Sequence, residues 1–259
     1  MSAILVHDDG AVRVLTIDRP DRRNAVDEAT ASELLSAVLA ADADPSVSVI
    51  VLTGSGNAFC AGADLRALSA AEPKPITAQG PGPMGPTRVR LSKPSIAAVE
   101  GPAVAGGLEL ALWCDLRVVA EDATLGVFCR RWGVPLVDLG TIRLPRLIGQ
   151  SRAMDLILTG RGIDGVEAER IGLANRVVAP GHALEEAVRL GHELAGLPQA
   201  CLRNDRLSVI EQWDLDEPAA IANEVRHGVE SLRSSDVLEG LARFAGGAGR
   251  HGQSAAADS

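Results

Sequence analysis

The residues best placed to do chemistry are a carboxylate and two glycines inside a very apolar segment. Residues 101–116 read GPAVAGGLELALWCDL, in which Glu109 follows Gly106 and Gly107. A carboxylate among such neighbours is costly to bury, so it either reaches water or is used by a site. The glycines precede an apolar run at 108–113 that is typical of a helix, and the free N–H groups of a helix start favour an oxyanion. The segment therefore predicts an acid or base beside an anion-binding turn.

A second turn rich in small residues lies at 54–65 and reads GSGNAFCAGADL. A dinucleotide-binding turn is not indicated, because Phe59 stands in the place of the third glycine of the G-x-G-x-x-G pattern. Small residues also let a ligand approach the main chain, and Ala61, Gly62 and Ala63 offer such an edge. Two N–H groups, one from each glycine-containing turn, would form a hole for the oxygen of an enolate.

Composition and charge limit the class of protein. The chain has 259 residues, 46% of them hydrophobic, which is enough to bury one large domain or a domain with an appended piece. A net charge of -9 and scattered Lys and Arg residues argue against a nucleic-acid partner. Charged residues interrupt every apolar run well before the roughly 18 residues of a membrane span, so no membrane partner is expected.

Cysteine and histidine spacing does not indicate a metal site. The 4 cysteines show no CxxC pattern, and none of the 5 histidines has a second His at i+4 or a nearby Cys. The chain opens MSAILVHDDG, without a basic region followed by an apolar run, so the cytosol is the expected compartment.

Strand and helix patterns alternate in the first half of the chain. Residues 4–17 alternate in hydrophobicity around Asp8-Asp9-Gly10, which predicts a β-hairpin. Asp27 can cap a helix with apolar residues at helical spacing, and residues 47–53 read as a buried strand. Further strands are expected over two later segments, 95–99 and 116–120. This order predicts an α/β core with parallel or mixed pairing.

Beyond residue 150 the patterns become helical. Ser151 can cap a helix that ends at Gly160, and Asp164 with Glu167 resembles a capping box for a helix that ends at Gly172. Helical periodicity also covers three later segments, 184–194, 219–232 and 237–244.

Two segments read as irregular. Residues 72–87, EPKPITAQGPGPMGPT, are rich in residues that break helices and strands, and they predict a mobile loop. The residues from Gly246 onward offer nothing to bury and predict a disordered tail.

Four motifs in this order resemble the crotonase superfamily, the enoyl-CoA hydratase/isomerase family. They are RPDRRNAV at 19–26, IVLTGSGNAFCAGADL at 50–65, KPSIAAVEGPAVAGGLELALWCDL at 93–116 and LTGRGIDGVEAERIGLANRVV at 158–178. The resemblance implies a spiral of ββα units over residues 1–195 and a helical region over 196–245 that builds homotrimers, often paired into hexamers. Residues 246–259 would form the tail.

The resemblance also implies roles for particular residues. Ala61 and Gly106 would supply the two N–H groups of the oxyanion hole, and Glu109 would be one of two catalytic glutamates. No tightly bound cofactor is implied, since coenzyme A arrives as part of the acyl-CoA substrate. The residues implied to contact coenzyme A are Arg23 or its neighbour Arg22, Ala25, Ala61, Gly62, Ala63, Asp64 and Leu65.

This chain departs from the family pattern at the second glutamate. The family motif FGxPE aligns with LGVFC, so Cys129 takes the place of the glutamate. A thiol is mostly neutral at pH 7 and handles protons less well than a carboxylate. Nine residues on, Asp138 lies near the place of an extra active-site acid in other family members, and it is a candidate catalytic residue. It can equally make a loop hydrogen bond or a salt bridge with one of two nearby arginines, Arg143 and Arg146.

The residues and the resemblance together predict chemistry on an acyl-CoA thioester through a stabilised enolate. Hydration of a 2-enoyl-CoA in fatty-acid metabolism is the first expectation, with Glu109 as general acid or base. Isomerase, hydrolase or decarboxylase activity remains open because of Cys129. An alternative of another class is a catalytically weak acyl-CoA-binding subunit that has kept the fold and lost the reaction.

Overall fold

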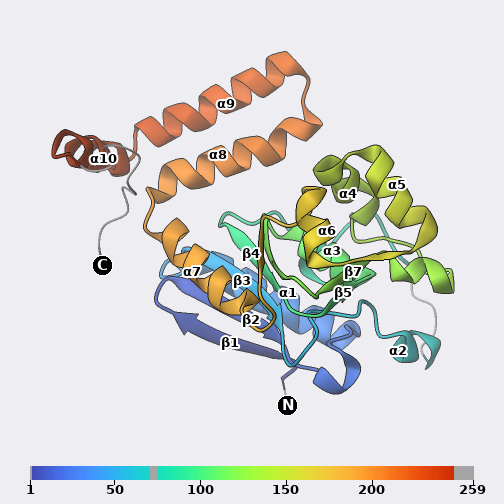
Figure 1. Ribbon diagram of the computed structural model, residues 1–259. Coiled ribbons are helices and arrows are strands. Elements are labelled where there is room, and N and C mark those ends of the chain that lie inside the picture. Colours follow the sequence, from blue (N-terminus) through green and yellow to red (C-terminus); the bar gives the residue numbers. More distant parts are fainter. Residues whose placement is uncertain (1, 71–74, 248–259) are drawn as a thin grey trace.

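The computed structural model describes residues 2–70 and 75–247 (Figure 1). The strands are β1 Ile4–Asp9, β2 Val12–Ile17, β3 Val49–Gly54, β4 Ser95–Val99, β5 Pro102–Val104, β6 Leu116–Ala120, β7 Thr124–Gly126, β8 Gly162–Ile163 and β9 Arg176–Val178. The α-helices are α1 Glu28–Ala43, α2 Leu65–Ala70, α3 Gly106–Trp113, α4 Gly140–Ile148, α5 Gln150–Thr159, α6 Gly165–Arg170, α7 Ala183–Ala195, α8 Gln199–Glu211, α9 Glu217–Leu232 and α10 Ser235–Ala245.

A mixed sheet forms the centre of the fold. Its strand order is β1-β2-β3-β4-β6-β9, and the pairing is parallel except between β1 and β2. The predicted hairpin is confirmed, with the chain turning at Gly10 in the left-handed region. β5 begins shortly after β4 ends, and it belongs to a smaller sheet with the strand order β5-β7-β8. The predicted α/β core with mixed pairing is therefore confirmed.

Alternating residues of the central strands pack against different helices. In β3, Val49 and Val51 belong to the hydrophobic cluster on the α7 side, whereas Ile50 and Leu52 belong to the cluster that contains α1 and α3. Side chains of a strand point alternately to its two faces, so a sheet covered on both faces needs continuous apolar strands. Figure 1 shows α7 lying across the sheet. The run VSVIVLT at 47–53 meets this requirement. The glycine-containing turn at 54–65 follows directly after β3.

The turn after β4 brings β5 next to the segment that follows β3. Gly101 turns the chain with a φ of 55°, and a Cβ there would overlap the carbonyl oxygen of Asn57. The turn lets β5 run beside the segment after β3, where Cys60 and Ala103 form a parallel bridge. Two segments 40 or so residues apart in sequence are thus joined by main-chain hydrogen bonds.

Several local predictions hold, and one is wrong. Asp27 and Asp164 cap α1 and α6 through the N–H groups of the third residue beyond each cap. Ser151 does not cap α5, which begins at Gln150 after Gly149, because this glycine turns the chain sharply between α4 and α5 with a φ of 81°. The α5 helix ends before Gly160 and α6 ends at Arg170, close to the expected glycines.

The expectation of a mobile loop over 72–87 falls partly on residues 71–74, which lie outside the described residues. Its later part, 82–87, is anchored instead. Met84, Gly85, Pro86 and Thr87 are buried, and both Met84 and Thr87 hydrogen-bond to Asp138. The glycines and prolines of residues 82–87 therefore form a fixed turn that packs against the core.

The helices α8, α9 and α10 follow the last strand of the central sheet. Figure 1 shows α8 and α9 as an antiparallel hairpin that extends away from the sheet, with α10 at its open end, opposite the turn between α8 and α9. The predicted tail falls largely on residues 248–259, outside the described residues. Among the described helices, none is both long and apolar enough to cross a membrane.

Asn24 joins the two loops that lead to the site, and its loss should destabilise the fold. It is fully buried with a φ of 57°; its Oδ1 accepts from the N–H of Arg19, and its Nδ2 donates to the carbonyls of Ser55 and Ala58. Asn24→Ala is expected to lower the free energy of unfolding by roughly 3 kcal/mol, because three main-chain groups, one of them fully buried, lose their hydrogen bonds. Urea unfolding measures this change. Asn57→Ala, at an exposed position in the loop to which Asn24 bonds, is the matched control, and equal effects of the two substitutions would contradict the assignment.

Candidate active site

The two glycine-containing turns of the sequence meet in the structure. The N–H of Cys60 donates to the carbonyl of Pro102 at 2.9 Å, and the N–H of Val104 donates to the carbonyl of Cys60 at 3.1 Å. A Cβ on Gly62 would lie 2.9 Å from the backbone nitrogen of Gly106, closer than real contacts allow. The absence of a side chain at Gly62 therefore lets the 60–64 segment lie directly against the start of α3.

Hydrogen-bond directions show which N–H groups in the first turn are free. The N–H of Ala61 donates to the carbonyl of Arg23 at 3.0 Å, so it is already occupied. The bridge between Val26 and Ala63 uses the carbonyl of Gly62 and the N–H of Asp64. In such a bridge, the N–H of Ala63 itself points away from Val26, toward the segment that leads to α3. Among the described residues it has no acceptor.

The second free N–H belongs to Gly106, the first residue of α3. Ala105 precedes it with a φ of 55°, an unusual value for a residue with a Cβ, and its N–H donates to the carbonyl of Gly126. This sharp change of direction starts the helix beside the 60–64 segment. The N–H of Gly106 has no acceptor among the described residues, as expected for a first helical turn. Ala63 and Gly106, rather than Ala61 and Gly106, thus form the pair of free donors.

Glu109 lies one turn further along α3 and is 2% exposed. Its Oε1 accepts the N–H groups of Asp138 at 2.9 Å and Gly140 at 2.8 Å. Its Oε2 accepts no hydrogen bond from any described residue. Burial raises the pKa of Glu109 to about 7, and the nearby negative charge of Asp138 also raises it. The two N–H groups and Arg143 favour the charged form and partly offset this rise. Near neutral pH this carboxyl group can both take and give a proton.

Cys129, which replaces the second glutamate of the family pattern, is 6% exposed. Burial raises the pKa of its thiol, and the negative charge of Glu109 raises it further. The thiol therefore stays neutral at physiological pH and lies near enough to Glu109 to feel its charge. It supplies no second carboxylate.

Asp138 supports the site through both its main chain and its side chain. Its N–H holds Glu109, while its Oδ1 accepts the N–H of Met84 at 3.0 Å and the hydroxyl of Thr87. Neither of the two arginines pairs with its carboxylate: Arg143 donates to the carbonyls of Asp138 and Thr87, and Arg146 lies over the ring of Trp213. Of the alternatives open from sequence, the structure shows the loop hydrogen bonds.

The residues implied to contact coenzyme A lie in two neighbouring segments, 22–25 and 61–65, which a hydrogen bond from Ala61 to Arg23 joins. Arg22, Arg23 and Leu65 are exposed, whereas Ala25 and Asp64 are buried. Sequence reasoning missed Arg19, whose guanidinium donates to the carbonyl of Ala25 and pairs with Asp64 at 3.2 Å. Its place in the RPD motif was the available signal. Arg19 holds the two backbone segments of this edge together.

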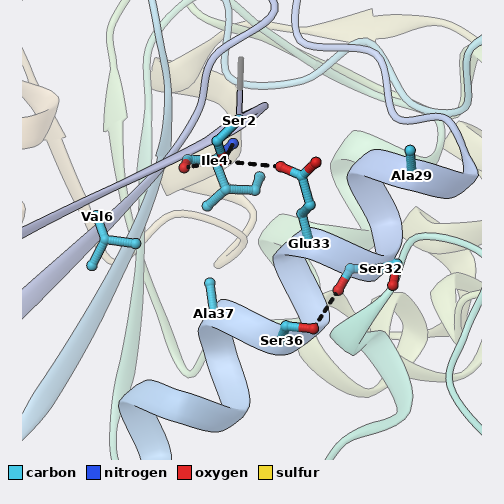
Figure 2. Close-up of a pocket in the computed structure, with 8 residues that line it drawn as sticks. All are labelled: Ser2, Ile4, Val6, Ala29, Ser32, Glu33, Ser36 and Ala37. Atoms are coloured by element: carbon cyan, nitrogen blue, oxygen red, sulfur yellow. Dashed lines mark hydrogen bonds between the residues drawn. The ribbon is translucent and has the colours of Figure 1, made fainter.

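Two open hollows lie away from these residues. The first, between β1 and α1, is lined by Ser2, Ile4, Val6, Ala29, Ser32, Glu33, Ser36 and Ala37 (Figure 2). In it Glu33 Oε2 accepts the hydroxyl of Ser2 at 2.9 Å, and no residue near Glu109 takes part. The second lies between the α7–α8 connection and α10. The free donors and the raised pKa, not these hollows, identify the candidate site.

Comparison with known proteins agrees with the geometry. A family model described as enoyl-CoA hydratase/isomerase matches residues 7–248. The chain is 35% identical to enoyl-CoA hydratase EchA19 of Mycobacterium tuberculosis, over 93% of this chain and 92% of that protein. It is also 35% identical to a crotonyl-CoA hydratase of Syntrophomonas wolfei, over 93% and 94%.

Solved structures extend this similarity to the fold. An enoyl-CoA hydratase of Mycobacterium tuberculosis has a TM-score of 0.90 at 34% identity, covering 95% of this chain and 96% of that one. EchA1 of Mycobacterium marinum has a TM-score of 0.89 at 33% identity, with the same coverage. The predicted crotonase-like fold is confirmed.

The raised pKa of Glu109 makes the stability of the protein depend on pH in a defined direction. The folded protein holds this proton more tightly than the unfolded chain, so the contribution is complete below about pH 4.5 and is lost as the pH rises through about 7. Relative to Glu109→Gln, the free energy of unfolding of the wild type is expected to fall by roughly 3 kcal/mol across that range. Urea unfolding of both proteins at a series of pH values measures the difference. A difference that is constant or that increases with pH would contradict the assignment.

Proposed function

Because the chain belongs to the enoyl-CoA hydratase/isomerase family, we propose that it is an enoyl-CoA hydratase-like enzyme that adds water to a 2-enoyl-CoA. The observation that carries this proposal is the placement of Glu109, with a pKa near neutrality, one helical turn after a free backbone donor. Coenzyme A enters as part of the substrate and is no permanent cofactor. The exposed edge formed by Arg23 and Leu65 offers it a surface beside the free N–H of Ala63.

The N–H groups of Ala63 and Gly106 would bind the thioester oxygen. Negative charge develops on this oxygen when a nucleophile adds to the conjugated double bond, because the product of addition is an enolate. Main-chain donors fixed by neighbouring hydrogen bonds stabilise that charge without having to reorganise. Ala63 takes this role in place of Ala61, whose N–H is bound to Arg23.

Glu109 would handle both proton transfers. Its free Oε2 takes a proton from water as the water oxygen bonds to the β-carbon and the double-bond electrons move to the thioester oxygen. The protonated carboxyl group then gives that proton to the α-carbon, so the enolate collapses to the 3-hydroxyacyl-CoA. Two fixed N–H donors to Oε1 keep the carboxyl group in one orientation through both steps.

Cys129 is the observation that favours a second candidate, double-bond isomerisation. Moving a double bond needs one group that removes and returns a proton, and it needs the same enolate hole, but no second acid to position water. Asp138 Oδ1 is engaged by Met84 and Thr87, so this oxygen does not take the place of the missing glutamate. Hydrolase and decarboxylase chemistry have no such observation in their favour.

Assembly into homotrimers, alone or paired into hexamers, belongs to the same proposal. Supporting it, large apolar side chains remain exposed along the C-terminal helices, among them Val209, Leu232, Leu238, Leu241 and Phe244. Exposed apolar surface of this extent is typical of an interface between proteins. Light scattering of the full chain gives the mass, and a monomer at micromolar concentration would contradict this part of the proposal.

Replacing the proposed acid–base residue separates an enzyme from a binding subunit. Glu109→Gln is expected to lower kcat by about a hundredfold or more while leaving KM nearly unchanged, because the amide cannot take a proton from water. Loss of the conjugated thioester absorbance of crotonyl-CoA follows the reaction. Glu121→Gln, at an exposed carboxylate, is the control. Tight binding of acyl-CoA without turnover by the wild type, or full activity of Glu109→Gln, would contradict the proposal.

The neutral thiol at position 129 is expected to contribute little to the reaction. Cys129→Ser keeps the size of the side chain, and its kcat for crotonyl-CoA should stay within about threefold of the wild type, because the thiol transfers no proton. The same absorbance assay measures it. A loss as large as that of Glu109→Gln would show that Cys129 takes part in proton transfer.

A further inference from the structure

Met84 occupies a position at the candidate site that sequence reasoning did not single out. It is 2% exposed, and its side chain lies against the main chain of Gly106, where a Cβ would be 2.6 Å from its sulfur. Gly106 is the residue whose N–H is proposed to hold the thioester oxygen. The Met84 thioether therefore lies beside the place that the acyl group of a substrate would occupy.

The backbone of Met84 is fixed independently of its side chain. A tight turn at residues 82–85 is closed by a bond from the N–H of Gly85 to the carbonyl of Gly82, and Gly85 has a φ of 90°. The N–H of Met84 donates to Asp138 Oδ1 at 3.0 Å. Gly85 also lies close to the main chain of α1, where a Cβ would be 2.5 Å from the carbonyl oxygen of Ala31. The turn thus holds Met84 from three directions.

The same contacts link Met84 to the reacting carboxyl group through Asp138. Asp138 binds the main chain of Met84 through its side chain and Glu109 through its own N–H. Gly106, which Met84 contacts, lies three residues before Glu109 on α3. Met84 therefore contacts one residue of the proposed oxyanion hole and is linked to the acid through Asp138. On its other side it belongs to the continuous hydrophobic core.

We infer that Met84 closes the acyl end of the site and restricts the substrate to short-chain 2-enoyl-CoA thioesters. This inference rests on the proposed function. The carbons that react need only reach Glu109, but each further methylene of a longer chain needs room where the Met84 side chain lies. Since the 82–85 turn is anchored and the core behind it is closely packed, that room is not available without displacing the thioether. Met84 is thus a specificity-determining residue, and Asp138 is the positioning residue that holds it.

The test compares chain lengths in the wild type and in two variants of the full-length protein. Rates are measured for crotonyl-, 2-octenoyl- and 2-dodecenoyl-CoA, and kcat/KM for the wild type is expected to fall with length. Met84→Ala removes the wall and should raise the ratio of kcat/KM for 2-dodecenoyl-CoA to that for crotonyl-CoA by about tenfold or more. Met84→Leu nearly conserves the volume of the side chain and should leave the ratio within about threefold of the wild type.

Measuring the binding of saturated acyl-CoAs tests the role of Met84 independently of the hydration reaction. Calorimetric titration of the wild type with butyryl-, octanoyl- and dodecanoyl-CoA should show the same preference for short chains, and Met84→Ala should remove it. If the wild type turns over no enoyl-CoA but shows this pattern of binding, the proposed function fails and the inference stands. If the wild type binds and hydrates the longest chain as well as the shortest, the inference is overturned, whether or not Met84→Ala folds. Equal ratios in Met84→Ala and the wild type would overturn it too.

Discussion

The close approach of two backbones is the constraint on which the site depends. The segment after β3 and the start of α3 lie so near each other that a Cβ on Gly62 would collide with the nitrogen of Gly106, and one on Gly107 would overlap the carbonyl of Cys60. Both donors of the proposed oxyanion hole exist because of this contact. Two local features sustain it, namely the hydrogen bonds between Cys60 and the 102–104 strand and the reversal of the chain at Ala105. The sheet and its helices hold these segments at the ends of neighbouring strands.

The 138–140 segment connects Glu109 with the 82–87 turn. The N–H groups of Asp138 and Gly140 fix one oxygen of Glu109, and the Asp138 side chain fixes the 82–87 turn. Arg143 ties the same parts together through the carbonyl of Thr87 at 2.6 Å. One short segment therefore sets the orientation of the acid and the position of the wall opposite it. Burial of Glu109 raises its pKa to about 7, close to neutral pH.

Sequence reasoning found the elements with local signals. The hairpin before Ile17, the cap at Asp27 and the helix after Gly106 each depend on a few neighbouring residues, and all three are present. The α8 helix carries a weak apolar pattern, and α4 contains Pro145, so neither has a clear local signal. Local chemistry was enough for these elements and for the two glycine turns.

The parts that sequence reasoning missed depend on contacts between distant residues. Whether the N–H of Ala61 or that of Ala63 is free depends on which partner segment each one faces, and residues 23–26 decide it. The hydrogen bonds of Asp138 to Met84 and Thr87 join residues more than 50 positions apart. Neither relation leaves a trace in the spacing of residue types. Arg19 had a signal in its motif, but its pairing with Asp64 joins residues that are distant in sequence.

The way in which Glu109 is held bears on how such a protein diversifies. Its carboxyl group is oriented by main-chain N–H groups, which every residue except proline provides, and no side chain among the described residues bonds to it. The identity of the residue at position 129 can therefore change without disturbing the acid or the hole for the oxyanion. A substitution at position 129 would then change the proton-handling groups of the site while Glu109 keeps its two main-chain donors.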